Sequence, residues 1–194
     1  MKSGRFYNTI FAMGLCAFAY FAQGSACLAQ DNIGALTEEN IISFIESTTD
    51  ITTGNSGELS SEKITAYLDK HLDKKARFKS VMKYHIPGMP PQEAALSLDK
   101  EGFMQSVSEG AKTTQSYENL IEIKEVKVSS NGKKAFVKTQ STEYATMPVP
   151  VADGSTENVP MEGVSDCTQI ISLHRGIIQM YSANCVTNIQ FLDH

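Results

Sequence analysis

Hydrophobic and polar residues alternate through most of the second half of the chain, which is the pattern of half-buried β-strands. From Leu120 to Leu192 this alternation predicts four successive strands. The segment PVPVADGSTENVPMEG, residues 148–163, is rich in proline and glycine and predicts a long loop between the middle two strands. The last two strands are expected to form a hairpin that turns near Arg175-Gly176.

The first hairpin of this region is centred on Asn131-Gly132, a dipeptide that favours the positive φ angles of a type I′ turn. With the turn at that dipeptide, Val128 lies opposite Ala135 and Val126 lies opposite Val137. The apolar positions of both strands therefore share one face of the sheet.

Three segments before this sheet combine helical spacing of apolar residues with a residue suited to cap a helix N-terminus. Thr37 is expected to cap a helix that runs to about Thr48. Ser60 or Ser61 is expected to cap the second helix, and Asp99 the third. The apolar stripes are Ile41, Phe44 and Ile45; then Ile64, Tyr67, Leu68 and Leu72; then Phe103, Val107 and Ala111.

Between the second and third helices, the segment ARFKSVMKYHI (residues 76–86) alternates and predicts a half-buried strand. The prolines of PGMPP end that strand, because proline cannot donate to a ladder. A short strand is expected at Ala94–Leu98. Helices concentrated ahead of a run of strands predict an α+β fold and not alternating βαβ units.

The order of helix, helix, strand, prolines, helix and four strands resembles the NTF2-like fold, which includes SnoaL-like and ketosteroid-isomerase-like proteins. The resemblance covers residues 38–192 and is strongest in LDKEGFMQSV, ENLIEIKEVKV, NGKKAFVKTQSTEY and the closing hairpin. It implies a cone, in which N-terminal helices pack on a strongly curved, mostly antiparallel sheet and leave a cavity. Some members are enzymes and many bind ligands or partners. Cystatin-like folds share part of this order and are the structural alternative.

The first 30 residues have the three-part layout of a secretory signal peptide. Lys2 and Arg5 precede an apolar run from about Ile10 to Ala22, and small residues follow up to Ala29. The run is short for a membrane span, so no stable span is expected after cleavage. The expected location of the protein is therefore periplasmic or secreted.

This layout predicts a signal peptide over residues 1–29, a flexible lead-in over residues 30–36 and a single domain over residues 37–194. Three alternatives remain: cleavage after Ala26, an uncleaved N-terminal anchor, and a lipoprotein acylated on Cys27.

Cleavage would leave two cysteines, Cys167 and Cys185, which flank the last hairpin. In an exported chain such a pair predicts a disulfide. A two-residue loop at Arg175-Gly176 would place Cys167 opposite Asn184 and turn Cys185 to the other face. The bridge therefore requires a three-residue loop or one bulge. Two buried free thiols are the alternative.

Composition and motifs narrow the range of functions that the sequence supports. The formal net charge of −5 argues against nucleic-acid binding. The four histidines, at positions 71, 85, 174 and 194, have no metal-ligand spacing with Cys, Asp or Glu, and we read them as exposed or marginal. The sequence contains no GxSxG, P-loop, GxGxxG or HExxH motif. We therefore expect no metal and no cofactor.

A basic stripe alternates along the predicted strand over residues 76–86, and further lysines follow between residues 124 and 138. Nucleic acid or anionic lipid is one interpretation of this charge. A solvated outer sheet face suits the acidic chain and the interspersed glutamates better. The stripe consists of Arg77, Lys79, Lys83 and His85.

Candidate site residues lie on the strand that follows Asn131-Gly132. If its apolar positions face the helices, Thr139, Ser141 and Glu143 lie on the same inward face. A carboxylate in an apolar pocket is a candidate general base. Tyr84 and Tyr181 are candidates to supply phenolic hydrogen bonds in that pocket. The alternative is a strand that twists past the core and leaves Glu143 in water, because Asp and Glu are rarely fully buried.

Three functional hypotheses follow from these observations. The first is an exported, non-enzymatic module that binds a small apolar ligand or a protein partner, with a homodimer formed through the outer sheet face. The second is an isomerase or hydratase with Glu143 as its base. The third is a component of a cell-envelope assembly, which a retained N-terminal anchor would favour.

The signal-peptide layout generates the first test. N-terminal sequencing or intact-mass measurement of exported protein should find a chain that begins near Gln30. A chain that retains Met1, or that carries lipid on Cys27, would contradict cleavage after Ala29.

Overall fold

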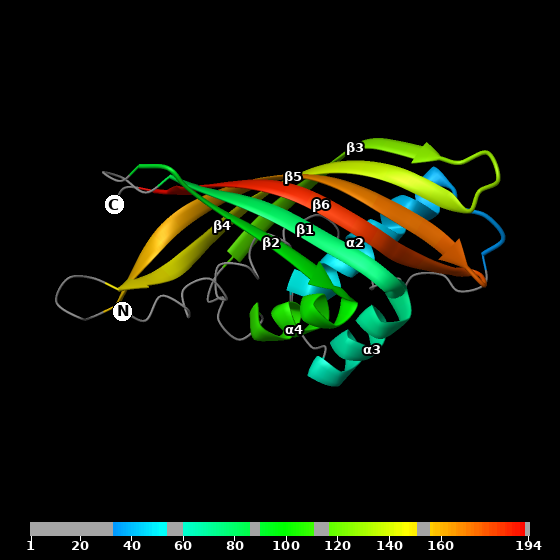
Figure 1. The fold of residues 1–194 in the computed structure, drawn as a ribbon, viewed down its shortest axis with the longest axis horizontal. Coiled ribbons are helices and arrows are strands. Elements are labelled where there is room, and N and C mark those ends of the chain that lie inside the picture. Colours follow the sequence, from blue (N-terminus) through cyan, green and yellow to red (C-terminus); the bar gives the residue numbers. More distant parts are fainter. Residues whose placement is uncertain (1–32, 54–59, 86–89, 111–116, 151–155, 193–194) are drawn as a thin grey trace.

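The computed structural model describes residues 33–53, 60–85, 90–110, 117–150 and 156–192, and the structural statements below concern these residues (Figure 1). The described helices lie on one side of a strongly curved six-stranded sheet. The strand order is β2-β1-β6-β5-β4-β3, and every neighbouring pair is antiparallel except β1 and β6. The predicted α+β fold with a curved, mostly antiparallel sheet is confirmed.

The elements follow the predicted order. The helices are α2 (Glu38–Thr53), α3 (Ser61–His71) and α4 (Lys100–Gly110). The strands are β1 (Leu72–His85), β2 (Gln92–Asp99), β3 (Tyr117–Val128), β4 (Lys134–Pro150), β5 (Thr156–His174) and β6 (Ile177–Phe191).

The predicted helix caps are confirmed. The N–H of Asn40 donates to the Thr37 hydroxyl, and the Asn40 side chain accepts from the N–H of Thr37. Ser60 caps α3, because its side chain accepts a hydrogen bond from the N–H of Lys63. Asp99 caps α4 through the N–H of Gly102. Each capping side chain accepts a hydrogen bond from a backbone N–H group in the first turn, which has no carbonyl partner within the helix.

The core lies between the concave sheet face and the helices. Phe44 of α2, Phe78 of β1 and Val137 of β4 are completely buried. The rings of Phe78 and Phe103 stack with their centroids 4.1 Å apart, which joins α4 to the sheet. His71, which we expected at the margin of the apolar stripe on its helix, is buried beside this core.

The β3–β4 hairpin has the predicted register, but its turn differs. Val128 pairs with Ala135, and Val126 pairs with Val137. Only Gly132 of the turn has a positive φ, at 63°, whereas a type I′ turn needs two such residues. The N–H of Gly132 instead donates to the carbonyl of Ser129, so the chain reverses one residue earlier.

The β5–β6 hairpin satisfies the geometric condition for the disulfide through a bulge. Arg175 and Gly176 form a two-residue turn with positive φ angles, and His174 pairs with Ile177. Ile171 then pairs with Met180 and Ile170 with Ser182, so one residue of β6 has no partner.

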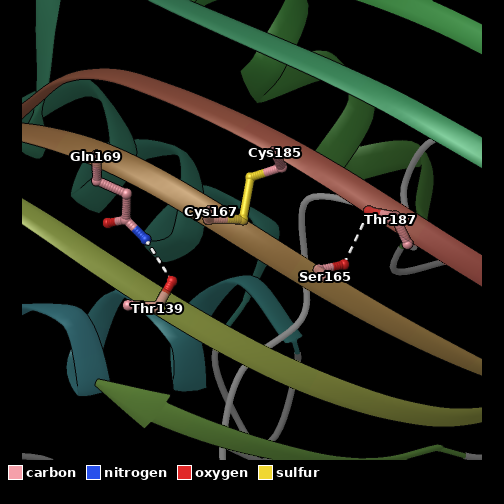
Figure 2. Close-up of a disulfide and its surroundings, with 6 residues drawn as sticks. All are labelled: Thr139, Ser165, Cys167, Gln169, Cys185 and Thr187. Atoms are coloured by element: carbon pink, nitrogen blue, oxygen red, sulfur yellow. Dashed lines mark hydrogen bonds between the residues drawn. A yellow bond between two sulfur atoms is a disulfide. The ribbon is translucent and has the colours of Figure 1, made fainter. Parts of the chain in front are cut away.

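This extra residue is Tyr181, and it shifts the following part of β6 by one position. Cys185 therefore pairs directly with Cys167, and the two form a disulfide on the concave face (Figure 2). The predicted bridge is confirmed.

Strands β4 and β5 continue beyond their neighbours as a two-stranded arm, formed by residues 146–150 and 156–160. The expected loop over residues 148–163 is therefore wrong except at residues 151–155, which lie outside the described residues. Its prolines are tolerated because a strand in a two-stranded ribbon uses only half of its N–H groups for pairing.

Residues 33–36 attach the N-terminal side of α2 to the ends of both hairpins. The N–H of Leu36 donates to the carbonyl of Gly132, and the N–H of Ile33 donates to the carbonyl of Gly176. Lys133 Nζ donates to the carbonyl of Gly34. The predicted signal peptide and the first part of the predicted lead-in, residues 30–32, lie outside the described residues.

The cross-strand disulfide closes a loop with a sequence separation of 18. The chain-entropy model assigns a loop of this size about 3 kcal/mol. For a domain of this length, that corresponds to a loss of about 6–12 °C in melting temperature. We therefore expect Cys185→Ser to melt lower than the oxidised protein by this amount, measured by circular dichroism. Both proteins should melt alike in reductant, and an equal difference in both conditions would contradict the stabilising role of the bridge.

Candidate functional site

The three predicted residues of β4 lie on the concave face, between the sheet and the helices. Thr139 and Ser141 are buried, and Glu143 is only 1% exposed. The inward orientation follows from strand alternation, because Val137 and Ala145 on the same strand are also buried.

Strand register places Glu143 in a row of residues that crosses the sheet. Its partner on β3 is Asn119, and its partner on β5 is Gly163. The row continues through Ile189 of β6 to Tyr84 of β1. In the adjacent row, Ser141 lies opposite Ser165, which pairs with Thr187. These rows bring inward residues of five strands together.

The concave face therefore carries a continuous group of buried polar side chains, which we term the polar band. Hydrogen bonds within it join neighbouring strands (Figure 2). Gln169 Nε2 donates to Thr139 Oγ1 at 3.2 Å, and the hydroxyls of Ser165 and Thr187 are 2.8 Å apart. The disulfide lies between these two bonds. The members of the polar band are Ser80, Asn119, Thr139, Ser141, Glu143, Ser165, Gln169 and Thr187.

Glu143 is the ionisable member of the polar band, and its carboxyl group is poorly satisfied. Among the described residues, Glu143 Oε1 has no hydrogen-bond partner, and none of the ion pairs includes Glu143. Burial without a compensating charge disfavours the carboxylate and raises the pKa of Glu143 well above its usual value of 4.5. Burial therefore favours the protonated form of this carboxyl group, whose hydroxyl can donate a hydrogen bond.

The two tyrosines proposed for the pocket have different positions. Tyr84 is buried in the same row as Glu143, and its hydroxyl donates to Met82 Sδ at 3.4 Å. Tyr181 is 42% exposed, with Lys134 Nζ 6.0 Å from its ring centroid. The expectation that Tyr181 points into the interior is wrong, because Tyr181 is the extra residue at the β6 bulge.

Sequence reasoning missed several members of the polar band on the other strands. Ser165 and Gln169 share the inward parity of Cys167 on β5, so the predicted disulfide carried a signal for both. Thr187 shares the parity of Cys185 on β6 in the same way. Gly163 carried no such signal, because its importance depends on its position opposite Glu143.

The remaining candidate sites have structural explanations. His71 Nδ1 lies 2.8 Å from the carbonyl oxygen of Ile178, and its ring centroid is 4.4 Å from that of Tyr67. Within the described ranges, no group of three or more His, Cys, Asp or Glu side chains is arranged to hold a metal ion. No helix in the described part of the chain is long and apolar enough to cross a membrane.

On the outer sheet face, lysines pair with glutamates. Lys127 and Lys138 both contact the carboxylate of Glu125, and these contacts lower the pKa of Glu125. The predicted solvated face agrees with the exposure of Arg77, Lys79 and Lys83.

The sequence matches no family model and no curated protein. The structure is similar to an NTF-2 like protein of unknown function from Silicibacter pomeroyi, with 13% identity, a TM-score of 0.40, and coverage of 81% of this chain and all of that chain. It is also similar to hexachlorocyclohexane dehydrochlorinase LinA-type3 from Novosphingobium barchaimii, with 11% identity, a TM-score of 0.42, and 68% and 79% covered.

A third similar structure is Aln2 from Streptomyces, with 10% identity, a TM-score of 0.45, and 78% and 93% covered. The element order and the curved, mostly antiparallel sheet agree with what the resemblance to NTF2-like proteins implied for the fold.

The buried carboxyl group generates a prediction on pH and stability. An acid whose pKa is higher in the folded chain binds its proton more tightly when folded. Its contribution to stability is complete below the unfolded pKa and is lost as the pH rises through the folded pKa. Between these values, the free energy of unfolding of the wild type should fall by about 1.4 kcal/mol per pH unit relative to Glu143→Gln.

Urea unfolding of both proteins over a pH series measures this difference. Glu122→Gln is the matched control, because the Glu122 side chain is exposed on β3 and paired with Lys124. A constant difference between wild type and Glu143→Gln across the series would show that the Glu143 pKa is not raised.

Proposed function

We propose that the protein is exported and binds a small, neutral, largely apolar ligand between the concave sheet face and the helices. Protonated Glu143 donates a hydrogen bond to an acceptor atom of that ligand. The observation that supports this function is the complete burial of Glu143 with Oε1 unpaired. A buried polar atom without a partner costs about 1–3 kcal/mol, and a bound ligand would remove that cost.

The chemistry of the interior favours a neutral ligand over an anion. The described side chains next to Glu143 in the strand register are hydroxyls, an amide and apolar groups. Buried Lys100 already pairs with Asp69 through an Nζ–Oδ1 contact of 2.7 Å. An anion beside Glu143 would be desolvated without a counter-charge, which is costly. A carbonyl or hydroxyl oxygen accepts the Glu143 proton without this cost.

The position of Glu143 also favours a small ligand over a protein partner. The carboxyl group is reached only within the interior of the fold, where a folded partner has no access. Export is supported by the disulfide, because such bonds persist in oxidising compartments and are rare in the cytosol.

Acid–base catalysis at Glu143 is the second candidate function. A raised carboxyl pKa brings the group closer to neutral pH, where a general acid or base is most effective. Glu143→Gln separates the two functions, because an amide still donates a hydrogen bond but cannot exchange a proton. A binding protein keeps its ligand affinity in this variant, whereas an enzyme loses turnover by about 100-fold or more.

A series of six-carbon rings tests the ligand class. We expect cyclohexanone to bind the wild type more tightly than cyclohexanecarboxylate or cyclohexylammonium by about tenfold or more, a difference of about 1.4 kcal/mol. Titration followed by NMR of the backbone amides measures each affinity and locates the site. Amide shifts should concentrate on β4, β5 and β6 around Glu143.

Variants connect this binding to the carboxyl group. Glu143→Met removes the hydrogen-bond donor at similar size and should weaken cyclohexanone binding, whereas Glu122→Met on exposed β3 should not. Equal affinity for all three rings, or binding that is unaffected by Glu143→Met, would contradict the proposed function.

A further inference from the structure

Gly163 is an exception among the inward positions of β5. The other inward residues of this strand all carry side chains that fill the interior: Met161, Ser165, Cys167, Gln169, Ile171 and Leu173. Gly163 is buried as well, and it lies directly opposite Glu143 in the strand register. The one inward position of β5 without a side chain therefore lies next to the Glu143 carboxyl group.

The two common reasons for a glycine do not apply to Gly163. The positive-φ glycines of the described chain are Gly132 and Gly176, so the backbone at Gly163 suits any residue. A Cβ added at Gly132 would meet Ala35 Cβ at 2.7 Å, whereas a Cβ added at Gly163 would meet nothing closer than 3.8 Å. Glycine also weakens a strand interior. Room beside the backbone for a group at least as large as a methyl remains as the explanation.

The walls of this space differ in polarity. Glu143 Oε2 lies 3.8 Å from the position of an added Cβ, and Thr187 Cγ2 lies 3.9 Å from it on β6. The Thr187 hydroxyl is bonded to Ser165, so its methyl group forms the other wall (Figure 2). The space therefore has a hydrogen-bonding side and an apolar side.

We propose that Gly163 determines the specificity of the site around Glu143. Its missing side chain admits the acceptor oxygen of a ligand to the Glu143 carboxyl group, and the Thr187 methyl limits the substituent beside that oxygen. The ligand class is a neutral ketone or alcohol with a small group next to the oxygen-bearing carbon. This inference rests on the proposed function and adds the position that sets the size of the ligand.

Gly163→Ala tests the inference by filling the space. The variant should keep or raise the melting temperature, since an added methyl makes only ordinary contacts and stiffens the unfolded chain. It should weaken cyclohexanone binding by about tenfold, the usual effect of losing about 1.4 kcal/mol. Gly34→Ala is the matched control, because Gly34 is exposed with nothing within 4 Å of an added Cβ, and its affinity should equal that of the wild type.

Thr187→Ser is the second variant and enlarges the same space. It keeps the hydroxyl that bonds Ser165 and removes the methyl wall. In the wild type 2-methylcyclohexanone should bind more weakly than cyclohexanone, and in Thr187→Ser this difference should disappear.

The outcomes separate this inference from the proposed function. If Gly163→Ala and Thr187→Ser bind both ketones as the wild type does while Glu143→Met does not, the role of Gly163 is overturned and the ligand class stands. A lower melting temperature for Gly163→Ala would also overturn it, because the glycine would then serve the backbone. If the wild type binds neither ketone, both proposals are overturned.

Discussion

One extra residue in β6 determines which side chains of the C-terminal hairpin face the helices. Before Tyr181 the buried residues of β6 are Ile178 and Met180, and after it they are Ala183, Cys185, Thr187 and Ile189. Strand alternation alone would turn the second group outward. Three features depend on this shift: the disulfide, the Ser165–Thr187 hydrogen bond, and the inward position of Ile189 in the row that contains Glu143.

Much of the fold could be predicted from local signals, because helix caps and strand alternation depend on neighbouring residues. The caps at Thr37, Ser60 and Asp99 are as expected, and so is the pairing of Val128 with Ala135. Bulges and ribbon extensions depend on distant partners. Residues 148–150 resemble a loop in isolation and become a strand because β5 continues beside them.

The candidate site was predictable only in part for the same reason. The parity of β4 was sufficient to place Glu143 inward, since Val137 on the same strand is a clear core residue. The neighbours of Glu143 come from other strands, and only the complete register identifies Asn119 and Gly163. Tyr181 was assigned inward because no local signal marks the position of the bulge.

The attachment of residues 33–36 to both hairpin turns has a consequence for folding order. These residues precede the sheet in the chain. The carbonyl groups that accept their hydrogen bonds, at Gly132 and Gly176, reach their final positions only when the β3–β4 and β5–β6 hairpins have formed. Closing such long loops carries an entropic cost that short-range contacts do not have. We therefore expect residues 33–36 to join the fold late, after the β3–β4 and β5–β6 hairpins have assembled.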